Sequence, residues 1–240
     1  MKKKNTAVIG AGWFGRAHVR NFHEVSRLQA VCDLNEEKLD IIRSNHQYDA
    51  VNLYSDVKDM IKNEDIDAAS IVTPPKYIPS LAKTLVTEGI DVLMEKPMAL
   101  SVKELKKFKK FEEDVRIMPG FIELYNPAFE KLMTHLPEIG EIISIASKRI
   151  GLYPRRDWQM GVILDLSIHD IYLQERVMHE EIQYTSGIKK CFKDNVHADA
   201  AFIILDFGKA IGQIESNWLT PSKFRRMYVN GENGGIMADF

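Results

Sequence analysis

The chain has 240 residues, with 32 lysines and arginines against 34 aspartates and glutamates, which gives a formal net charge of −2. This length suggests one large or two modest domains with a sizeable core, and the near-neutral charge argues against a nucleic-acid or anionic-membrane partner. We find no secretory signal and no apolar run that approaches a membrane span, and the two cysteines suggest neither a disulfide framework nor a zinc site, so we expect a cytoplasmic protein.

The first predicted elements are a short apolar strand at 6–9 and a helix at 13–24, and the glycines between them match the dinucleotide-binding fingerprint. The first glycine of this fingerprint permits a tight turn, the second lets backbone amides reach the pyrophosphate, and the third lets helix pack on strand. The pyrophosphate then lies at the N-terminus of the helix, where the dipole favours negative charge. The expected dinucleotide contacts in this turn are Gly10, Gly12, Trp13, Phe14 and Gly15.

A second apolar strand, at 28–32, ends at Asp33, about where the ribose-binding acid of the fingerprint belongs. A carboxylate there accepts a hydrogen bond from the 2′-hydroxyl and repels a 2′-phosphate. The next residues, 34–36, include no arginine, so the sequence favours NAD over NADP. The alternative is an acidic turn after an ordinary strand.

Strand and helix patterns alternate through the first half of the chain, which predicts right-handed crossovers and a doubly wound parallel sheet. We therefore expect an NAD-binding Rossmann domain over residues 1–120, closed by Pro119-Gly120. The predicted strands lie near 6–9, 28–32, 50–53, 67–72, 90–94 and 115–118, and the predicted helices near 13–24, 36–45, 56–63, 77–88 and 101–112.

The tripeptide Glu95-Lys96-Pro97 closes the strand at 90–94. Ligands of an open parallel sheet lie outside the carboxyl ends of its strands, near the point where the strand order reverses. A lysine at that place, beside a bound nicotinamide, is positioned for chemistry.

The second half, residues 121–240, has a different pattern. A helix near 126–135, a strand at 141–149 and a helix near 161–178 precede four alternating apolar stretches. This order predicts an α+β domain with an open, mainly antiparallel sheet and one covering helix. The four stretches lie at 182–192, 197–207, 210–218 and 224–230.

Asp165 and His169 are four residues apart on the predicted helix at 161–178 and so share one face. Both interrupt an apolar stretch, where buried ionisable groups need partners. A carboxylate one turn away orients an imidazole and stabilises its protonated form, as a general base requires. The alternatives are a surface ion pair or a satisfied core histidine.

Together these motifs resemble the glucose–fructose oxidoreductase and inositol dehydrogenase (Gfo/Idh/MocA) family, over essentially the whole chain. The resemblance implies that Lys96 and His169 form the catalytic pair, that Asp165 is their partner, and that Glu95 and Thr73-Pro74 lie beside the cofactor, NAD. Segments 148–155, 161–170 and 215–221 look like the branch that oxidises the 3-hydroxyl of UDP-N-acetylglucosamine.

We therefore expect an enzyme, an NAD-dependent dehydrogenase acting on a secondary hydroxyl of a sugar. In the expected mechanism His169 takes the hydroxyl proton and Lys96 stabilises the developing alkoxide, and the reverse assignment stays open. The expected substrate contacts include three arginines suited to a diphosphate, although a solvated basic loop is an equal alternative. These contacts are Asn126, Arg149, Tyr153, Arg155, Arg156 and Trp218, and no metal site is expected.

Some features depart from the family. Relatives usually carry an arginine within 121–125 and many carry a histidine where Ile78 stands, and they continue beyond residue 240. We therefore expect a shortened second domain, whose open sheet edge calls for a partner subunit in a homo-oligomer. Two other functions stay open: a dehydrogenase or reductase of a free sugar or inositol, and an NAD(H)-binding regulator without turnover.

Overall fold

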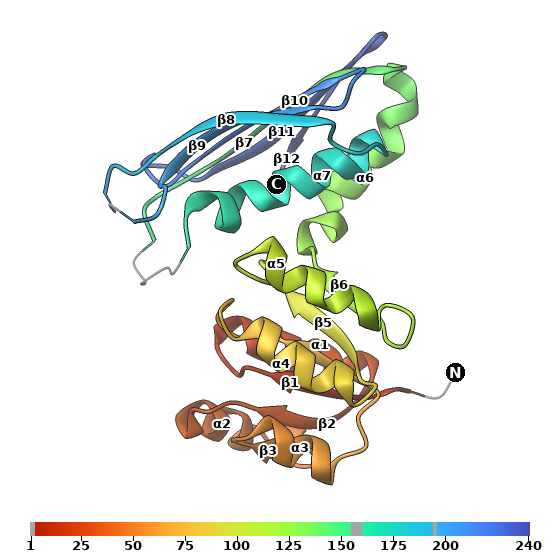
Figure 1. Ribbon diagram of the computed structural model, residues 1–240, viewed down its shortest axis with the longest axis vertical. Helices are drawn as coiled ribbons and strands as arrows, with labels where there is room; N and C mark the ends of the chain where they lie inside the picture. Colours follow the sequence, from red (N-terminus) through yellow and green to blue (C-terminus); the bar gives the residue numbers. More distant parts are fainter. Residues whose placement is uncertain (1–2, 155–159, 194–195) are drawn as a thin grey trace. The chain divides into compact units, whose positions relative to one another are not determined.

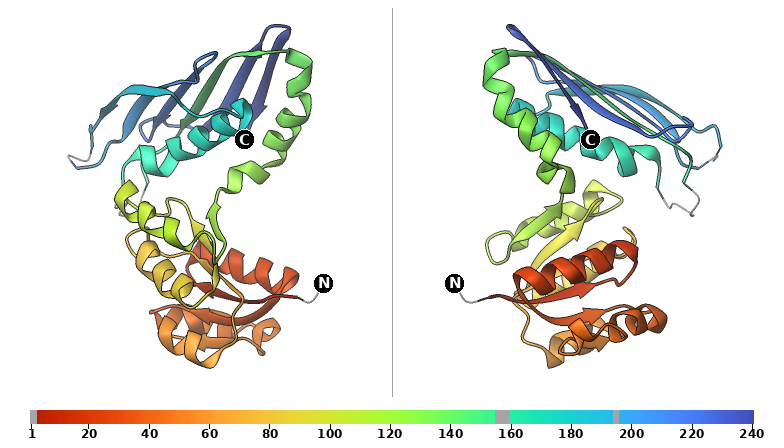
Figure 2. Two further views of the ribbon diagram at one scale, coloured as in Figure 1. Left: turned by 45° about the vertical axis from the view of Figure 1, so that its right-hand side comes forward. Right: turned by 180° about the vertical axis from the view of Figure 1, so that it is seen from behind.

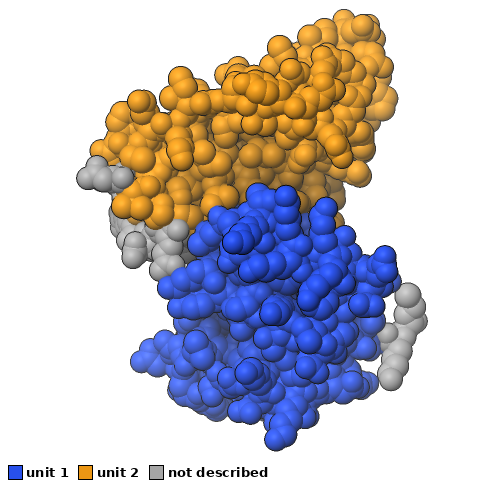
Figure 3. Space-filling view, in the orientation of Figure 1, with its two compact units in different colours: residues 1–120 blue, residues 121–240 orange. Residues whose placement is uncertain are grey.

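The computed structural model describes residues 3–154, 160–193 and 196–240. The chain divides into two compact units, which are shown in different colours in Figure 3: unit 1 spans residues 1–120 and unit 2 spans residues 121–240. The predicted residues Arg155 and Arg156 lie outside the described part of the chain. Each unit is described by itself.

Unit 1 is a six-stranded parallel sheet in the order β3-β2-β1-β4-β5-β6, with helices between the strands (Figure 1). The doubly wound fold is thereby confirmed, and the strand order reverses between β1 and β4. Its elements are β1 (Asn5–Ile9), α1 (Trp13–Val25), β2 (Arg27–Cys32), α2 (Glu36–Arg43), η1 (His46–Tyr48), β3 (Asn52–Tyr54), α3 (Val57–Asn63), β4 (Ala68–Ile71), α4 (Ile78–Thr87), β5 (Asp91–Glu95), α5 (Val102–Leu105), η2 (Lys106–Phe111) and β6 (Ile117–Gly120).

The apolar residues of β1 are buried on both faces of the sheet. Ala7 and Ile9 belong to a core cluster with residues of α3 and α4, whereas Val8 belongs to a second cluster with residues of α1 and α2. Successive side chains of a strand point to opposite faces, so a strand covered on both sides must be continuously apolar. This requirement explains why the strands of unit 1 could be predicted from the sequence.

The predicted helix at 101–112 forms only one α-helical turn, α5, and continues as the 3₁₀ segment η2. Leu105, Phe108 and Phe111 recur every third residue, which is the repeat of a 3₁₀ helix rather than an α-helix. Phe108 is buried in the core and Phe111 packs against it, while the lysines between them are exposed.

Unit 2 contains a six-stranded sheet in the order β12-β11-β7-β10-β9-β8, antiparallel except for the parallel pair β7–β10. The mainly antiparallel sheet is thereby confirmed. The elements are η3 (Ile122–Tyr125), α6 (Pro127–His135), η4 (Leu136–Ile139), β7 (Ile142–Ile150), the π-helical η5 (Ile163–Ser167), α7 (Ile168–Met178), β8 (Tyr184–Lys190), β9 (Ala200–Asp206), β10 (Ile211–Asn217), β11 (Phe224–Gly231) and β12 (Gly234–Asp239).

Two helices, α6 and α7, pack on the same face of this sheet (Figure 2), so the prediction of a single covering helix was wrong. Phe129 and Leu132 of α6 share one core cluster with Leu173 and Val177 of α7 and with inward residues of the strands. The α6 segment is short and follows Asn126-Pro127, and the sequence pattern did not reveal which face it covers.

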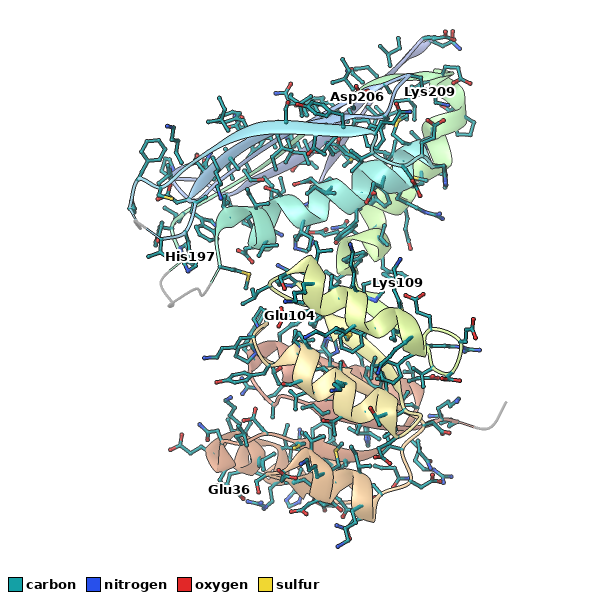
Figure 4. The ribbon with its side chains drawn as sticks, in the orientation of Figure 1. Glu36, Glu104, Lys109, His197, Asp206 and Lys209 are labelled. Carbon is teal, nitrogen blue, oxygen red and sulfur yellow. The ribbon has the colours of Figure 1, made fainter. Side chains whose placement is uncertain are left out.

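The turn between β9 and β10 shows how local sequence sets the strand register. The Asp206 carboxylate accepts a hydrogen bond from the backbone N–H of Gly208 at 2.7 Å, and Gly208 adopts a φ of +82° that favours glycine. Lys209 pairs with Glu180 at 2.6 Å, and Asp206 and Lys209 lie at the same end of the sheet (Figure 4).

Among the described residues, no helix has the length and apolar character needed to cross a membrane.

Candidate functional site

The glycine-rich turn between β1 and α1 has the geometry that the fingerprint requires. Gly10 adopts a φ of +101°, and a Cβ there would collide with the Val72 carbonyl oxygen. A Cβ on Gly15 would collide with the Gly10 carbonyl oxygen, whereas one on Gly12 would meet open space. The first and third glycines therefore serve the packing of the turn, and Gly12 leaves its backbone accessible to a ligand.

A cavity of about 640 Å³ lies next to this turn, in unit 1 alone. Its described lining includes Gly10, Gly12, Asp33, Lys38, Thr73 and Pro74. Among the described residues, the hydroxyl of Thr73 is buried without a hydrogen-bond partner. A buried orphan hydroxyl in a cavity wall is a group that a polar ligand would satisfy. Trp13 and Phe14, which the sequence also placed at this site, lie outside the lining that the described residues form.

Asp33 lines the cavity with a nearly buried carboxylate. One oxygen accepts a hydrogen bond from the backbone N–H of Ala11 at 2.7 Å, and the other accepts one from Asn35 N–H at 2.9 Å. The ammonium of Lys38 lies 3.2 and 3.3 Å from the two oxygens. Sequence reasoning missed Lys38, although it falls on the first turn of α2, five residues after Asp33.

Lys96 follows β5 directly and is half-buried, and its peptide bond to Pro97 is cis. The backbone N–H of Lys96 donates to the Glu95 carboxylate at 3.3 Å. Glu95 itself is buried, and its other carboxylate oxygen lies 3.2 Å from Nε2 of His18. The structure thus gives Glu95 protein partners and places it outside the described cavity lining.

In unit 2, Asp165 lies in the π-helical segment η5, whereas His169 lies in the first turn of α7. Both side chains are buried. Nδ1 of His169 lies 2.7 Å from the hydroxyl of Tyr172, which also accepts a hydrogen bond from the backbone N–H of Glu123 at 3.2 Å. Burial raises the pKa of Tyr172, so this hydroxyl stays protonated. Tyr172 is a partner of His169 that sequence reasoning missed, although the i, i+3 spacing carries the signal.

Arg149, a predicted substrate contact, has two buried carboxylate partners in unit 2. Its side chain is 1% exposed, and its guanidinium donates to Asp170 at 2.9 Å and to Glu123 at 2.8 Å. Burial lowers the pKa of Arg149, but the two carboxylates outweigh this effect and the net direction is upward. Arg149 is therefore neutralised inside unit 2, and its role as a substrate contact stays a prediction.

A hollow of about 660 Å³ opens on unit 2, and sequence reasoning identified only part of its wall. Its described lining includes Arg149, Leu152, Asp165, Trp218, Lys223 and Arg225. Arg225, which sequence reasoning missed, is 32% exposed, and its guanidinium lies 3.6 Å from Glu123. Burial lowers the pKa of Arg225, and the nearby Arg149 lowers it further.

The remaining predicted contacts have mainly structural partners. Trp218 is 5% exposed and packs edge to face with Tyr153, at 5.8 Å between ring centroids. Asn126 caps α6 by accepting from Ala128 N–H at 3.0 Å, and it donates to Glu123 at 2.8 Å. Trp218 therefore exposes little of its surface and Asn126 caps a helix, and their roles as substrate contacts stay predictions.

Comparisons with known proteins agree with this architecture. The sequence model described as "Oxidoreductase family, NAD-binding Rossmann fold" matches residues 4–120, and the one described as "GFO/IDH/MocA C-terminal domain" matches residues 137–237. The chain belongs to this oxidoreductase family. NAD is therefore its cofactor, and the resemblance inferred from the motifs is confirmed.

Named relatives lie at moderate identity. The UDP-N-acetylglucosamine 3-dehydrogenase of Acidithiobacillus ferrooxidans is 28% identical over 170 residues, which cover 70% of this chain and 52% of that protein. The myo-inositol 2-dehydrogenase of Thermotoga maritima is 24% identical over 250 residues, 97% of this chain and 74% of that protein. The structure of GenD2 from gentamicin A biosynthesis, in complex with NAD, matches the fold with a TM-score of 0.90 at 20% identity, over 100% of this chain and 73% of that one.

The residues of unit 1 fit the cofactor of the oxidoreductase family. Gly12 leaves open space for the pyrophosphate at the start of α1, and the orphan hydroxyl of Thr73 offers a hydrogen bond in the cavity wall. Asp33 presents a carboxylate at the end of β2, where the ribose belongs. In the part of the chain that the structure describes, no three or more potential metal ligands gather into one group.

Proposed function

We propose that the protein oxidises a secondary hydroxyl of a sugar with NAD, and that its substrate is UDP-N-acetylglucosamine, oxidised at the 3-hydroxyl, or a similar nucleotide sugar. The observation that carries the proposal is the hollow of unit 2, which combines the carboxylate of Asp165 with the cations of Lys223 and Arg225. A carboxylate suits sugar hydroxyls, and a guanidinium suits a diphosphate. The 28% identity to a UDP-N-acetylglucosamine 3-dehydrogenase supports the same substrate class.

In the proposed cofactor site the turn of Gly10, Gly12 and Gly15 binds the pyrophosphate, and Asp33 binds the ribose. Thr73 and Pro74 contact the cofactor from the end of β4. NAD, when bound, supplies the hydride acceptor for the oxidation. Unit 1 is thus the proposed NAD-binding domain, and unit 2 the substrate-binding and oligomerisation domain.

We assign the proton chemistry to His169 and Lys96, with Asp165 as their partner. Lys96 belongs to unit 1 and His169 to unit 2, and the support for pairing them is the sequence resemblance. For His169 to take the hydroxyl proton at Nε2, its Nδ1 must carry hydrogen and donate to Tyr172. The opposite tautomer would make His169 the donor to the substrate oxygen and an uncharged Lys96 the base.

We also propose that the protein forms a homo-oligomer through the sheet face of unit 2 that α6 and α7 leave uncovered. By the strand register, one row across this face reads Asp239, Arg226, Lys148, Glu215 and Phe202. Arg226 pairs with Asp239 at 2.7 Å, and Lys148 with Glu215 at 2.9 Å. The four charges of the row are thus paired within one copy and sum to zero, so they add no net repulsion to the approach of a second copy.

The next row on this face is largely apolar, with the exposed residues Met237, Tyr228 and Ile204. Exposed apolar rows of this kind mark association surfaces. Light scattering after gel filtration is expected to show a mass above 27.5 kDa, and Ile204→Lys to shift it towards the monomer. A monomeric unaltered protein would contradict the homo-oligomer.

The test of the substrate is NADH formation measured across UDP-sugars, free sugars and inositols. Because a 3-keto product is labile, a trap such as an aminotransferase belongs in the assay. If kcat/KM is highest with UDP-N-acetylglucosamine, the proposal is supported. If kcat/KM is highest with an inositol or a free sugar, the proposed substrate class is wrong and that compound class takes its place. NAD binding without turnover of any member of the panel would favour the regulator.

A further inference from the structure

Three side chains from three different elements of unit 1 lie in continuous polar contact. The hydroxyl of Ser70, on β4, lies 2.8 Å from Nδ1 of His18, on α1. Nε2 of the same imidazole lies 3.2 Å from Oε1 of Glu95, the last residue of β5. Ser70 is 0% exposed and Glu95 is 8% exposed, so solvent contributes little to these contacts. We call Ser70, His18 and Glu95 the α1 relay.

The chemistry of the groups fixes the direction of the relay. A carboxylate attracts N–H groups, so its position 3.2 Å from Nε2 favours the tautomer of His18 that carries its hydrogen on Nε2. In the neutral imidazole Nδ1 is then an acceptor, and the Ser70 hydroxyl donates to it. The other oxygen of Glu95 accepts from the backbone N–H of Lys96 at 3.3 Å. The Ser70 hydroxyl, both ring nitrogens of His18 and both carboxylate oxygens of Glu95 therefore each have a polar neighbour within 3.3 Å.

The relay is held rigidly at both ends. His18 packs against Phe14 edge to face, with ring centroids 5.0 Å apart, and is stacked with Phe22 at 6.3 Å. Glu95 lies against Gly120, where a Cβ would come within 2.6 Å of Oε1 and leave the carboxylate no room. The imidazole and the carboxylate are thus confined to the positions in which they meet.

We propose that His18 is a positioning residue, which holds the Glu95-Lys96 turn against α1 through the α1 relay and thereby sets the position of the Lys96 side chain. The helix that carries His18, α1, begins at the glycine turn of the proposed pyrophosphate site. The same helix therefore holds both the proposed cofactor site and the Lys96 turn in place. The proposal rests on the proposed role of Lys96 in the reaction. It explains why a histidine, and not an apolar residue, occupies this buried place on α1.

The test compares His18→Leu with His18→Gln, whose amide nitrogen can still donate to Glu95. His23→Leu is the matched control, because His23 also lies on α1 and packs edge to face on an aromatic ring, Tyr48, outside the relay. We expect His18→Leu to lower kcat by roughly tenfold to a hundredfold, the scale of misplacing a reacting group by about 1 Å. The Kd for NAD is expected to change less than about threefold, which is under 0.7 kcal/mol, and His18→Gln to recover most of kcat.

A second measurement does not depend on turnover. Acylation of lysines under limiting reagent, followed by mass spectrometry, reports the reactivity of Lys96 relative to the exposed Lys103 of the same protein. We expect His18→Leu, but not His23→Leu, to change this ratio by at least about threefold, which corresponds to about 0.65 kcal/mol. If Lys96→Met keeps full turnover, the proposed function fails while the labelling still tests the relay. Unchanged Lys96 labelling and unchanged kcat in His18→Leu would overturn the relay and leave His18 a packing residue.

Discussion

Of the charged side chains in the cavity wall, we expect Asp33 and Lys38 to decide the choice between NAD and NADP. The carboxylate of Asp33 repels a 2′-phosphate, but the ammonium of Lys38, 3.2 Å from it, offsets part of that repulsion. For two unit charges about 6 Å apart at an effective dielectric constant of about 40, Coulomb's law gives about 1.4 kcal/mol, a factor of about ten. We expect NAD to bind at least about tenfold more tightly than NADP.

Removing the charge of Lys38 and removing the charge of Asp33 should shift the ratio of NAD affinity to NADP affinity in opposite directions. Lys38→Met is expected to widen the preference for NAD by about tenfold, because the carboxylate loses its partner cation. Asp33→Ser combined with Leu34→Arg is expected to narrow or invert the preference. Lys62→Met, on the exposed side of α3, is the matched control and should leave the ratio unchanged.

The measurement is the Kd of each dinucleotide by calorimetric titration, at two salt concentrations, because exposed charge effects weaken with salt. Equal affinity of the unaltered protein for NAD and NADP would refute the role of Asp33. An equal change of both affinities in Lys38→Met would show that Lys38 does not act at the 2′ position.

Three further predictions concern the proposed catalytic residues and two arginines of unit 2. Lys96→Met and His169→Ala are each expected to lower kcat by roughly two to four powers of ten in the NADH assay, the usual scale for a general acid or base, with little change in the Kd of NAD. Arg149→Leu is expected to lower the free energy of unfolding by about 3–5 kcal/mol in a denaturant titration, since it removes the cation that pairs with the buried carboxylate of Asp170 and leaves Glu123 with the more distant Arg225. Arg225→Ala is expected to raise KM for the nucleotide sugar without a comparable loss of kcat, and added salt to raise KM of the unaltered protein as well.

The fold of unit 1 could be predicted because its rules are local. Strands buried on both faces are continuously apolar, glycines are required at Gly10 and Gly15 by close backbone approach, and Asp33 follows its strand directly. Each of these signals lies within about ten residues of the feature that it predicts. The relay of His18, by contrast, joins residues 52 positions apart, and the pattern of the helix alone is typical of an ordinary amphipathic face.

Charges brought together from distant parts of the chain could not be predicted from the sequence, and the two arginines of unit 2 show why. Arg149 on β7 and Arg225 on β11 are direct cross-strand neighbours, an arrangement that like charges disfavour. Glu123 lies 2.8 Å from Arg149 and 3.6 Å from Arg225, whereas Asp170 pairs with Arg149. Both carboxylates come from other elements: Glu123 lies 26 residues before Arg149, and Asp170 lies 21 residues after it. Arg149 is therefore neutralised inside the unit, whereas Arg225 shares one carboxylate and keeps a third of its surface towards the hollow. On this charge distribution, Arg225 is the better of the two to meet an anionic substrate.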